Sequence, residues 1–384
     1  MTDSHPAPPP LLPEGLRDRL PDEAEAASRV MRALIDVFAG HGYRRVAPPI
    51  AEFRETLATD GDAGANSLLR FTDPVSRRTL AIRPDITRQV GRIATSSMAA
   101  QPRPMRLCYA GQVAKLAAST LWPEREMMQI GAELIGSDAT AALCEIAKMA
   151  VDALAAAGVS DISVDLTLPD LVDTLAASTL PLPDGNLAAV RAALDAKDAG
   201  ALAWLGASAY LPLLAATGDF DRAIERLASI DAQGVLAGRI AALRAVNAAI
   251  SGVARVTLDP TERHGFEYQS GIGFSFFAQY PADTQGRFGA FSIGRGGSYT
   301  ISHADGRSEA AVGFSLYPDP LIMAGLGRSA GEAARLFLPI GYDAGAADAL
   351  RASGWVTIAA LSPADDPRAL GCTHVLDGVS ATKL

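Results

Sequence analysis

Hydrophobic residues near the N-terminus recur every three or four positions, which is the period of an amphipathic helix. This run lies within 27–38, and Asp22 and Glu25 precede it with a spacing typical of a helix N-cap. The pattern predicts a helix that starts at Asp22 and ends near Gly40 or Gly42. The same period predicts two further helices, over 85–97 and 141–157.

Alternating hydrophobic and polar residues predict strands in two parts of the chain. The first group lies at 43–52, 67–72, 78–83, 105–113, 126–135 and 160–167. The second group lies at 254–259, 266–278, 289–294 and 311–316. Pro48 and Pro49 interrupt the first strand, and because proline is not tolerated in a central strand we expect that segment at a sheet edge or an interface.

The order of these elements favours an α+β fold over alternating βαβ units. We expect an antiparallel sheet core over 13–167 and 251–326, after a disordered, proline-rich leader at 1–12. Residues 168–250 are rich in Ala and Leu and predict an all-helical insert between the two groups of strands. A β-α-β rhythm over 327–384 predicts a small α/β appendage.

Composition narrows the class of protein. The 384 residues are 49% hydrophobic, with a formal net charge of −9 and a sequence pI of about 5.1, which argues against a nucleic-acid binder. Three isolated cysteines, Cys108, Cys144 and Cys372, show no metal-ligand spacing and suit a reducing, cytoplasmic compartment. We expect no metal, no cofactor and no membrane span, since no apolar run reaches the length that a span needs.

Four segments concentrate the residues that could carry chemistry. They are IRPDITRQVGR at 82–92, RLCYAGQVAKLAASTLWPEREMMQIGAELIG at 106–136, HGFEYQ at 264–269 and AVGFSLYPDPL at 311–321. All four resemble signature segments of the class II histidyl-tRNA synthetases, the second of them without a gap. The resemblance covers about residues 13–325 and implies the antiparallel sheet of that class.

Carboxylates and amides are suitable acceptors for the ammonium group of an amino acid. The resemblance implies that such a group and an imidazole are held by Asp85, Thr87, Gln129, Glu133, Glu267, Tyr268 and Tyr299. Asp85 stands where the family has Glu, Glu267 where it has Asp, and Gln269 where it has a third tyrosine. Without the resemblance, the spacing of these residues favours ordinary polar positions on strands and at a helix start.

The arginines with which the family contacts ATP are missing. Lys115, His264 and Pro320 stand at their positions. A guanidinium stays charged and bonds phosphate bidentately, whereas lysine loses the fork, histidine is mostly neutral at pH 7 and proline offers no donor. The sequence therefore predicts that amino-acid activation has been lost. Arg263 is the best-placed residue for a substitute guanidinium, and His264 could also be a structural histidine or a contact to a ligand carboxylate.

Within this family, the chain resembles the non-catalytic regulatory subunits of ATP phosphoribosyltransferase. The resemblance implies a homodimer within a hetero-oligomer that activates a short catalytic subunit, with histidine as feedback effector and no bound tRNA. The dimer is expected to form through the Pro49 segment and the helix before it. Two alternatives stay open at this point, an active synthetase-like enzyme that activates histidine or a related amino acid, and a free-standing amino-acid-binding protein.

Overall fold

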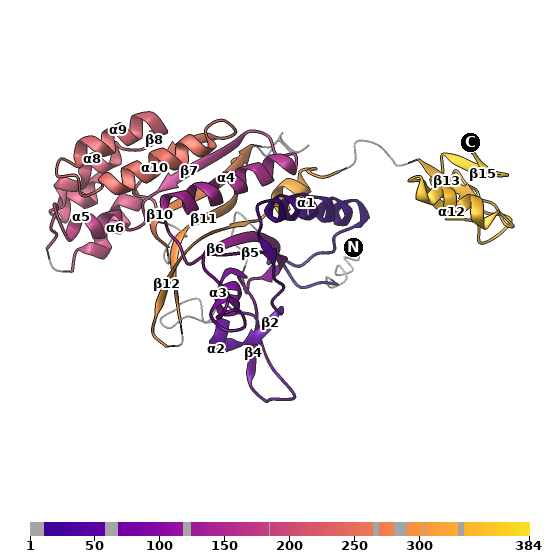
Figure 1. The fold of residues 1–384 in the computed structure, drawn as a ribbon, viewed down its shortest axis with the longest axis horizontal. Coiled ribbons are helices and arrows are strands. Elements are labelled where there is room, and N and C mark those ends of the chain that lie inside the picture. Colours follow the sequence, from indigo (N-terminus) through magenta and orange to yellow (C-terminus); the bar gives the residue numbers. More distant parts are fainter. Residues whose placement is uncertain are drawn as a thin grey trace, which may run out of the picture. The chain divides into compact units, whose positions relative to one another are not determined.

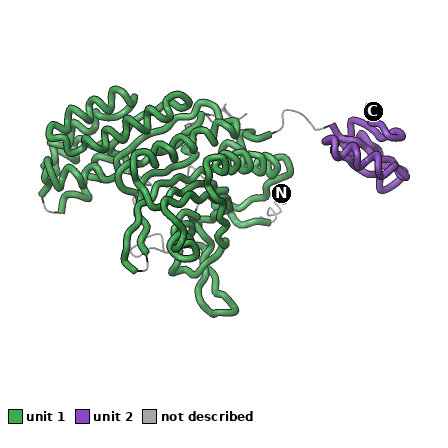
Figure 2. The backbone as a smooth tube through the Cα atoms, viewed as in Figure 1, with its two compact units in different colours: residues 1–328 green, residues 329–384 purple. Residues whose placement is uncertain are grey.

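The computed structural model describes residues 11–57, 68–117, 124–183, 185–263, 269–279, 290–303, 305–328 and 334–384. The chain divides into two compact units, Met1–Arg328 and Ser329–Leu384, shown in different colours in Figure 2. In these ranges no helix is both long enough and apolar enough to cross a membrane. The division into a leader, a core, an insert and a tail stays a prediction.

Nine strands of the described chain form one sheet in the larger unit. In spatial order they are β1 (Arg44–Arg45), β5 (Met105–Ala114), β6 (Glu126–Ile135), β12 (Ser308–Leu316), β11 (Ala290–Ser302), β10 (Gln269–Gln279), β7 (Ile162–Thr167), β9 (Arg255–Leu258) and β8 (Gly218–Asp219). Two neighbouring pairs, β1 with β5 and β7 with β9, are parallel, and the others are antiparallel. The α+β sheet core is confirmed, but the sheet is mixed rather than purely antiparallel.

One face of this sheet is apolar and is covered by helices. Because side chains alternate along a strand, buried residues such as Ile130, Phe314 and Phe274 share this face. It packs against α1 (Pro21–Gly40), α4 (Thr140–Ala156) and α10 (Ala237–Ile250), which lie along the strands in Figure 1. The rings of Phe38 in α1 and Phe314 in β12 meet edge to face with their centroids 5.4 Å apart.

The first helix has the predicted length, but its start differs from the prediction. Leu20 is the N-cap residue, and no side chain caps the helix, so the predicted cap at Asp22 is wrong. Pro21 occupies the first helical position, where its missing N–H would have no partner in any helix. Asp22 lies one residue later and contributes a negative charge to the first turn.

A smaller three-stranded sheet contains strands that precede Asp85 in the sequence. It has the order β2 (Ala51–Phe53), β4 (Thr79–Ile82) and β3 (Arg70–Thr72), and α2 (Arg54–Leu57) follows β2 directly. The prolines separate β1 from β2, and each of these short strands lies at a sheet edge, as predicted. The next helix, α3, spans Thr87–Thr95. It begins two residues later than predicted because the Asp85 carboxylate accepts a hydrogen bond from the backbone N–H of Thr87, at 2.8 Å.

The insert is helical with one exception. Its elements before α10 are α5 (Leu171–Ala176), α6 (Leu187–Asp195), α7 (Ala199–Trp204), the 3-10 turn η2 (Ser208–Tyr210), α8 (Leu211–Leu214) and α9 (Phe220–Ile230). The expectation of an all-helical insert is wrong at Gly218 and Asp219, because these two residues form β8 and pair with β9. The short closing helix of the larger unit is α11 (Asp319–Met323).

The smaller unit is an α/β structure with its own core. Its four strands have the order β14 (Val356–Ala359), β13 (Arg335–Leu338), β15 (His374–Asp377) and β16 (Ser380–Lys383), with α12 (Ala344–Ala352) between β13 and β14. Leu336, Leu338, Ala347 and Leu376 form its buried cluster. The predicted β-α-β order is confirmed, and β16 is an additional strand that the sequence analysis missed.

Candidate functional site

The candidate site lies on the second face of the nine-stranded sheet, the polar face, where polar side chains lie next to a smaller hydrophobic cluster that includes Val90 and Ala94 of α3. On β6 the alternation places Gln129, Gly131 and Glu133 on this face, with their apolar neighbours on the helix-covered face. Asp85 and Thr87 approach it at the start of α3. Gln129 and Glu133 are 0% and 1% exposed, so both side chains need partners within the protein.

Gln129 connects the start of α3 to the sheet. Its amide nitrogen donates to the Asp85 carboxylate at 2.7 Å and to the Ser315 hydroxyl at 2.8 Å. Its amide oxygen accepts the backbone N–H of Ile86 at 2.8 Å. The donor and acceptor ends of the amide are therefore both satisfied, and the orientation of Gln129 is fixed.

Glu133 is a buried carboxyl group held by two phenols. Tyr299 donates to one of its oxygens at 2.8 Å, and Tyr109 donates to the other at 3.2 Å. Burial raises the pKa of Glu133 to about 8; the Tyr299 and Tyr109 hydrogen bonds oppose this rise, and the nearby charge of Asp85 adds to it. A cation that reaches Glu133 would be stabilised by the ionised form, so the site is suited to an ammonium or imidazolium group.

The centre of this network consists of two residues that the sequence analysis did not identify. The Tyr109 hydroxyl lies 2.9 Å from Ser315 Oγ and 3.0 Å from Thr87 Oγ1, and it also contacts Glu133. Burial, followed by the charges of Glu133 and Asp85, raises the pKa of Tyr109 well above its usual value, so the phenol stays protonated.

Two glycines in the sequence are consistent with these contacts, because each lies where a larger residue would collide with a side chain of the network. A Cβ on Gly131 would lie 2.4 Å from the Tyr109 hydroxyl, and a Cβ on Gly313 would lie 1.6 Å from a Glu133 oxygen. Gly131 pairs with Ser315 and Gly313 pairs with Glu133 across β6 and β12. Glycine at these positions therefore leaves the room that the large polar side chains occupy.

The structure thus brings together Asp85, Thr87, Gln129, Glu133 and Tyr299 in one hydrogen-bonded network on a single sheet face. His264, Glu267 and Tyr268, the remaining predicted site residues, lie outside the described residues.

The described residues at the other lost arginine positions do not restore a phosphate clamp. Lys115 follows β5 and keeps a positive charge, but reduced hydration and then the Arg295 charge lower its pKa, while the Asp85 charge acts in the opposite direction. Its side chain is exposed, so its ammonium group keeps access to water. Pro320 is buried in the first turn of α11, where its ring supplies no hydrogen-bond donor.

Several of the remaining arginines are engaged elsewhere. The guanidinium of Arg83 donates to the carbonyl oxygens of Pro48 and Gln112, each at 2.8 Å, and Arg92 forms an ion pair with Glu52. The backbone N–H of Arg263 donates to Asp195 at the end of α6, which places this residue beside the insert. That Arg263 replaces a lost guanidinium stays a prediction.

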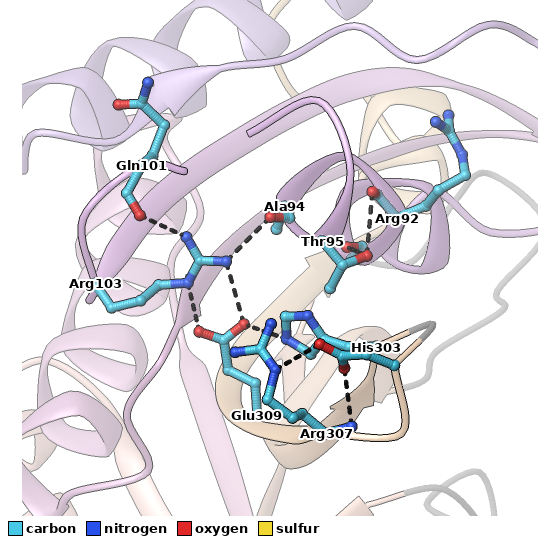
Figure 3. Close-up of polar contacts among 10 residues, drawn as sticks. Arg92, Ala94, Thr95, Gln101, Arg103, His303, Arg307 and Glu309 are labelled. Atoms are coloured by element: carbon cyan, nitrogen blue, oxygen red, sulfur yellow. Dashed lines mark hydrogen bonds and ion pairs between the residues drawn. The ribbon is translucent and has the colours of Figure 1, made fainter. Parts of the chain in front are cut away.

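A salt-bridge cluster connects the far end of α3 to the β11–β12 hairpin (Figure 3). Arg103 forms an ion pair with Glu309 of β12 and donates to the carbonyl oxygen of Ala94 in α3 at 3.0 Å. His303, which follows β11, lies 3.0 Å from the same carboxylate. These contacts fix α3, whose first residue is Thr87, against the strand that carries Ser315.

A separate cavity of about 200 Å³ lies near the N-terminal segment, and its lining shares no residue with the network. The lining residues are Gly15, Arg17, Asp18, Arg19, Gln112, Glu124, Glu126 and Asp319. Its two arginines are paired with Glu23 and Asp319, so they offer no free charge to a triphosphate. Over the described ranges, no three His, Cys, Asp or Glu side chains are grouped so that they could hold a metal ion.

Comparison with known proteins agrees with this geometry. The histidyl-tRNA synthetase family profile matches residues 15–321. The regulatory subunit of ATP phosphoribosyltransferase from Paramagnetospirillum magneticum is 40% identical over 382 residues, which cover 96% of this chain and 97% of the relative. The regulatory subunit from Rhodospirillum centenum is 39% identical over 379 residues, with 96% and 95% covered.

Solved structures show the same fold at lower identity. A chain from Bacillus halodurans, described as an ATP phosphoribosyltransferase regulatory subunit/histidyl-tRNA synthetase, superposes with a TM-score of 0.77 at 22% identity, covering 96% of this chain and 97% of that one. Histidyl-tRNA synthetase from Nostoc sp. gives a TM-score of 0.72 at 14% identity, with 95% and 90% covered. The chain therefore belongs to the histidyl-tRNA synthetase family and, within it, to the non-catalytic regulatory subunits of ATP phosphoribosyltransferase.

Proposed function

We propose that this chain activates a short catalytic subunit of ATP phosphoribosyltransferase and transmits histidine feedback to it. Relatives that are about 40% identical over nearly their whole length are regulatory subunits of that enzyme. The regulatory role follows from the family, whereas the effector, its site and the assembly are proposals. The observation that carries the effector proposal is the buried acceptor network around Gln129 and Glu133.

The network suits free histidine. Histidine presents an ammonium group and an imidazole, and the site offers the Asp85 and Glu133 carboxyl groups within a few ångströms of hydroxyl and amide groups. In the structure these groups bond one another. Binding therefore exchanges internal hydrogen bonds for contacts with the ligand, which gives histidine a means to shift the conformation of the site.

The same site is unsuited to forming an aminoacyl adenylate. A bent triphosphate needs several bidentate cations, and Lys115 and Pro320 together provide one ammonium group. If each lost charged contact removes about 1.5–3 kcal/mol, the losses at Lys115, His264 and Pro320 together lower the rate or affinity by about 10³ to 10⁶. We therefore propose that amino-acid binding is retained for regulation.

We propose that two copies of the chain assemble through the Pro49 segment and α1. Ile50, next to Pro49, is exposed although hydrophobic, and it precedes the edge strand β2. Two side chains hold the backbone of this segment. Arg83 donates to the carbonyl oxygen of Pro48 and Gln89 donates to the carbonyl oxygen of Pro49, each at 2.8 Å. A preformed apolar edge of this kind is suited to pairing with a second subunit.

The function is tested by mixing the chain with a short-form ATP phosphoribosyltransferase and measuring product formation from ATP and phosphoribosyl pyrophosphate. We expect the chain to increase the rate and histidine to reverse the increase. Glu133→Gln should keep the activation but weaken the response to histidine by about tenfold or more, because a carboxylate contact to a cation is lost. Glu126→Gln, at the exposed end of the same strand, is the matched control and should behave like the wild type.

Two results would contradict this function. One is a catalytic subunit whose rate is unaffected by the chain at any ratio. The other is ATP–pyrophosphate exchange by the purified chain at a rate typical of a synthetase, which would favour the alternative of an active amino-acid-activating enzyme.

A further inference from the structure

We infer that Arg295 binds the carboxylate of the amino acid held in this pocket, an inference that rests on the proposed histidine site. The network around Glu133 provides acceptors and hydroxyl groups, which suit the cationic parts of a zwitterion. A carboxylate needs a cationic partner as well. His264 stands at the sequence position from which the synthetases supply an arginine, so the carboxylate requires a different residue here.

Strand register places Arg295 beside the network. Arg295 pairs with Ser315 across β11 and β12, Ser315 pairs with Gly131 of β6, and Gly131 pairs with Tyr109 of β5. Residues that pair directly across neighbouring strands project from the same face. Arg295 therefore rises from the polar face, next to the serine that bonds Gln129 and Tyr109.

One strand, β12, lies between the acceptors on β6 and Arg295 on β11. Neighbouring strands are about 5 Å apart, so β6 and β11 are separated by about 10 Å, with β12 between them. On the polar face β12 presents Gly313 and Ser315 in this region, and Gly313 pairs with Gly297 of β11. A zwitterionic amino acid that contacts both Glu133 and Arg295 therefore has to reach across β12, as Tyr299 does when it bonds Glu133.

The charge of Arg295 has no counter-ion in the described chain. The residue is half-buried, and its guanidinium makes no hydrogen bond or ion pair with any described residue. Reduced hydration and then the charge of Arg295 lower the pKa of the Lys115 ammonium group, so Arg295 and Lys115 repel each other. Two neighbouring cations, one of them half-buried, are unfavourable without an anion near them. A bound carboxylate removes that penalty.

The inference is tested by calorimetric titration of the full-length chain with L-histidine and with histamine, which lacks the carboxylate. Arg295→Gln should weaken histidine binding by about 10- to 100-fold, as expected for a lost charge-assisted contact, and should leave histamine affinity unchanged within about threefold. Arg295→Lys should retain part of the preference for histidine, because the charge remains. Arg255→Gln is the matched control, since β9 places Arg255 on the same face of the same sheet, three strands from β11.

The outcomes separate this inference from the proposed function. Equal weakening of histidine and histamine by Arg295→Gln, or no weakening of either, overturns the role of Arg295 while the histidine site stands. Inorganic phosphate that binds the wild type but not Arg295→Gln, with an unchanged ratio of histidine to histamine affinity, also overturns it. If the wild type binds neither ligand, or if Glu133→Gln weakens neither, the histidine site itself is refuted. Far-UV circular dichroism of each variant identifies a folding defect, and Arg295→Lys then provides the test.

Discussion

Glu133 is buried where its neutral form is favoured, although its partners can also stabilise its charge. Burial raises the pKa of this carboxyl to about 8 despite donation from Tyr299 and Tyr109. With this pKa, Glu133 is mostly protonated near pH 7. Because an incoming ammonium or imidazolium group favours the ionised form, histidine binding should release a proton in this range.

The first prediction concerns the pH dependence of stability. Between its ordinary pKa of 4.5 and a folded-state pKa of about 8, Glu133 binds more protons in the folded chain than in the unfolded chain. The free energy of unfolding therefore falls as pH rises through this window, by up to a few kcal/mol. Glu133→Gln, which is neutral at every pH, should lose less stability than the wild type between about pH 5 and about pH 8.

Urea denaturation of both proteins across this range measures the effect. Glu126→Gln, on the same strand but exposed, should follow the wild-type curve. Parallel stability curves for the wild type and Glu133→Gln would show that Glu133 titrates near its ordinary pKa.

For single residues, the sequence predicts the site side chains that lie in recognisable motifs. It misses the side chains that reach the site only through pairing between strands. Gln129 and Glu133 are four residues apart on β6, which is two periods of a strand. The sequence of β6 alone therefore predicts that the two side chains share a face. Ser315 meets Gln129 only because β6 and β12 pair in one particular register. That register is fixed by packing across the whole sheet, which no local pattern of the sequence records.

Among the elements, α3 has the largest influence on the pocket because both of its ends are held by side chains. At its start, Asp85 accepts the backbone N–H of Thr87. At its end, Arg103 bonds the Ala94 oxygen and forms the ion pair with Glu309 that is drawn in Figure 3. The side chains of Arg103 and Glu309 are 22% and 15% exposed, so solvent screens this pair only partly.

The second prediction follows from this arrangement. Arg103→Met should lower the free energy of unfolding by about 1–3 kcal/mol, because a largely buried carboxylate loses its arginine partner. It should also weaken histidine binding, since α3 positions Thr87 at the pocket. Urea denaturation and calorimetric titration measure the two effects.

Arg307→Met is the matched control for Arg103→Met. Arg307 belongs to the same hairpin and pairs with Asp305, but both side chains of that pair are mostly exposed. A surface pair of this kind contributes little, so neither stability nor histidine affinity should change measurably. If the two variants behave alike, the Arg103 cluster does not position α3.

The limits of prediction differ among the elements. Strands β5 and β6 and helix α4 follow the sequence pattern to within about a residue, because their alternation or helical period is long and uninterrupted. The two-residue strand β8 has no pattern of its own, since it exists only through pairing with β9. The start of α1 was misplaced because Pro21, rather than Asp22, sets the first helical position.

For the whole molecule, the network and the C-terminal α/β structure belong to different compact units. Every described residue of the network, and Arg295 as well, belongs to the unit Met1–Arg328, which has its own hydrophobic core. The unit Ser329–Leu384 has a separate buried cluster around Leu336 and Leu338. We therefore expect effector binding to need only the first unit, whereas activation of a catalytic subunit can involve either.

The third prediction is that a chain ending at Arg328 folds and binds histidine with the affinity of the full-length chain, within about threefold. The reason is that no described pocket residue and no member of its supporting cores is removed. Calorimetric titration measures the affinity, and circular dichroism verifies folding. A loss of more than about tenfold in a folded truncated chain would show that the C-terminal unit contributes to the pocket. With affinity retained, the rate of the catalytic subunit mixed with the truncated chain then shows which unit carries the activating surface.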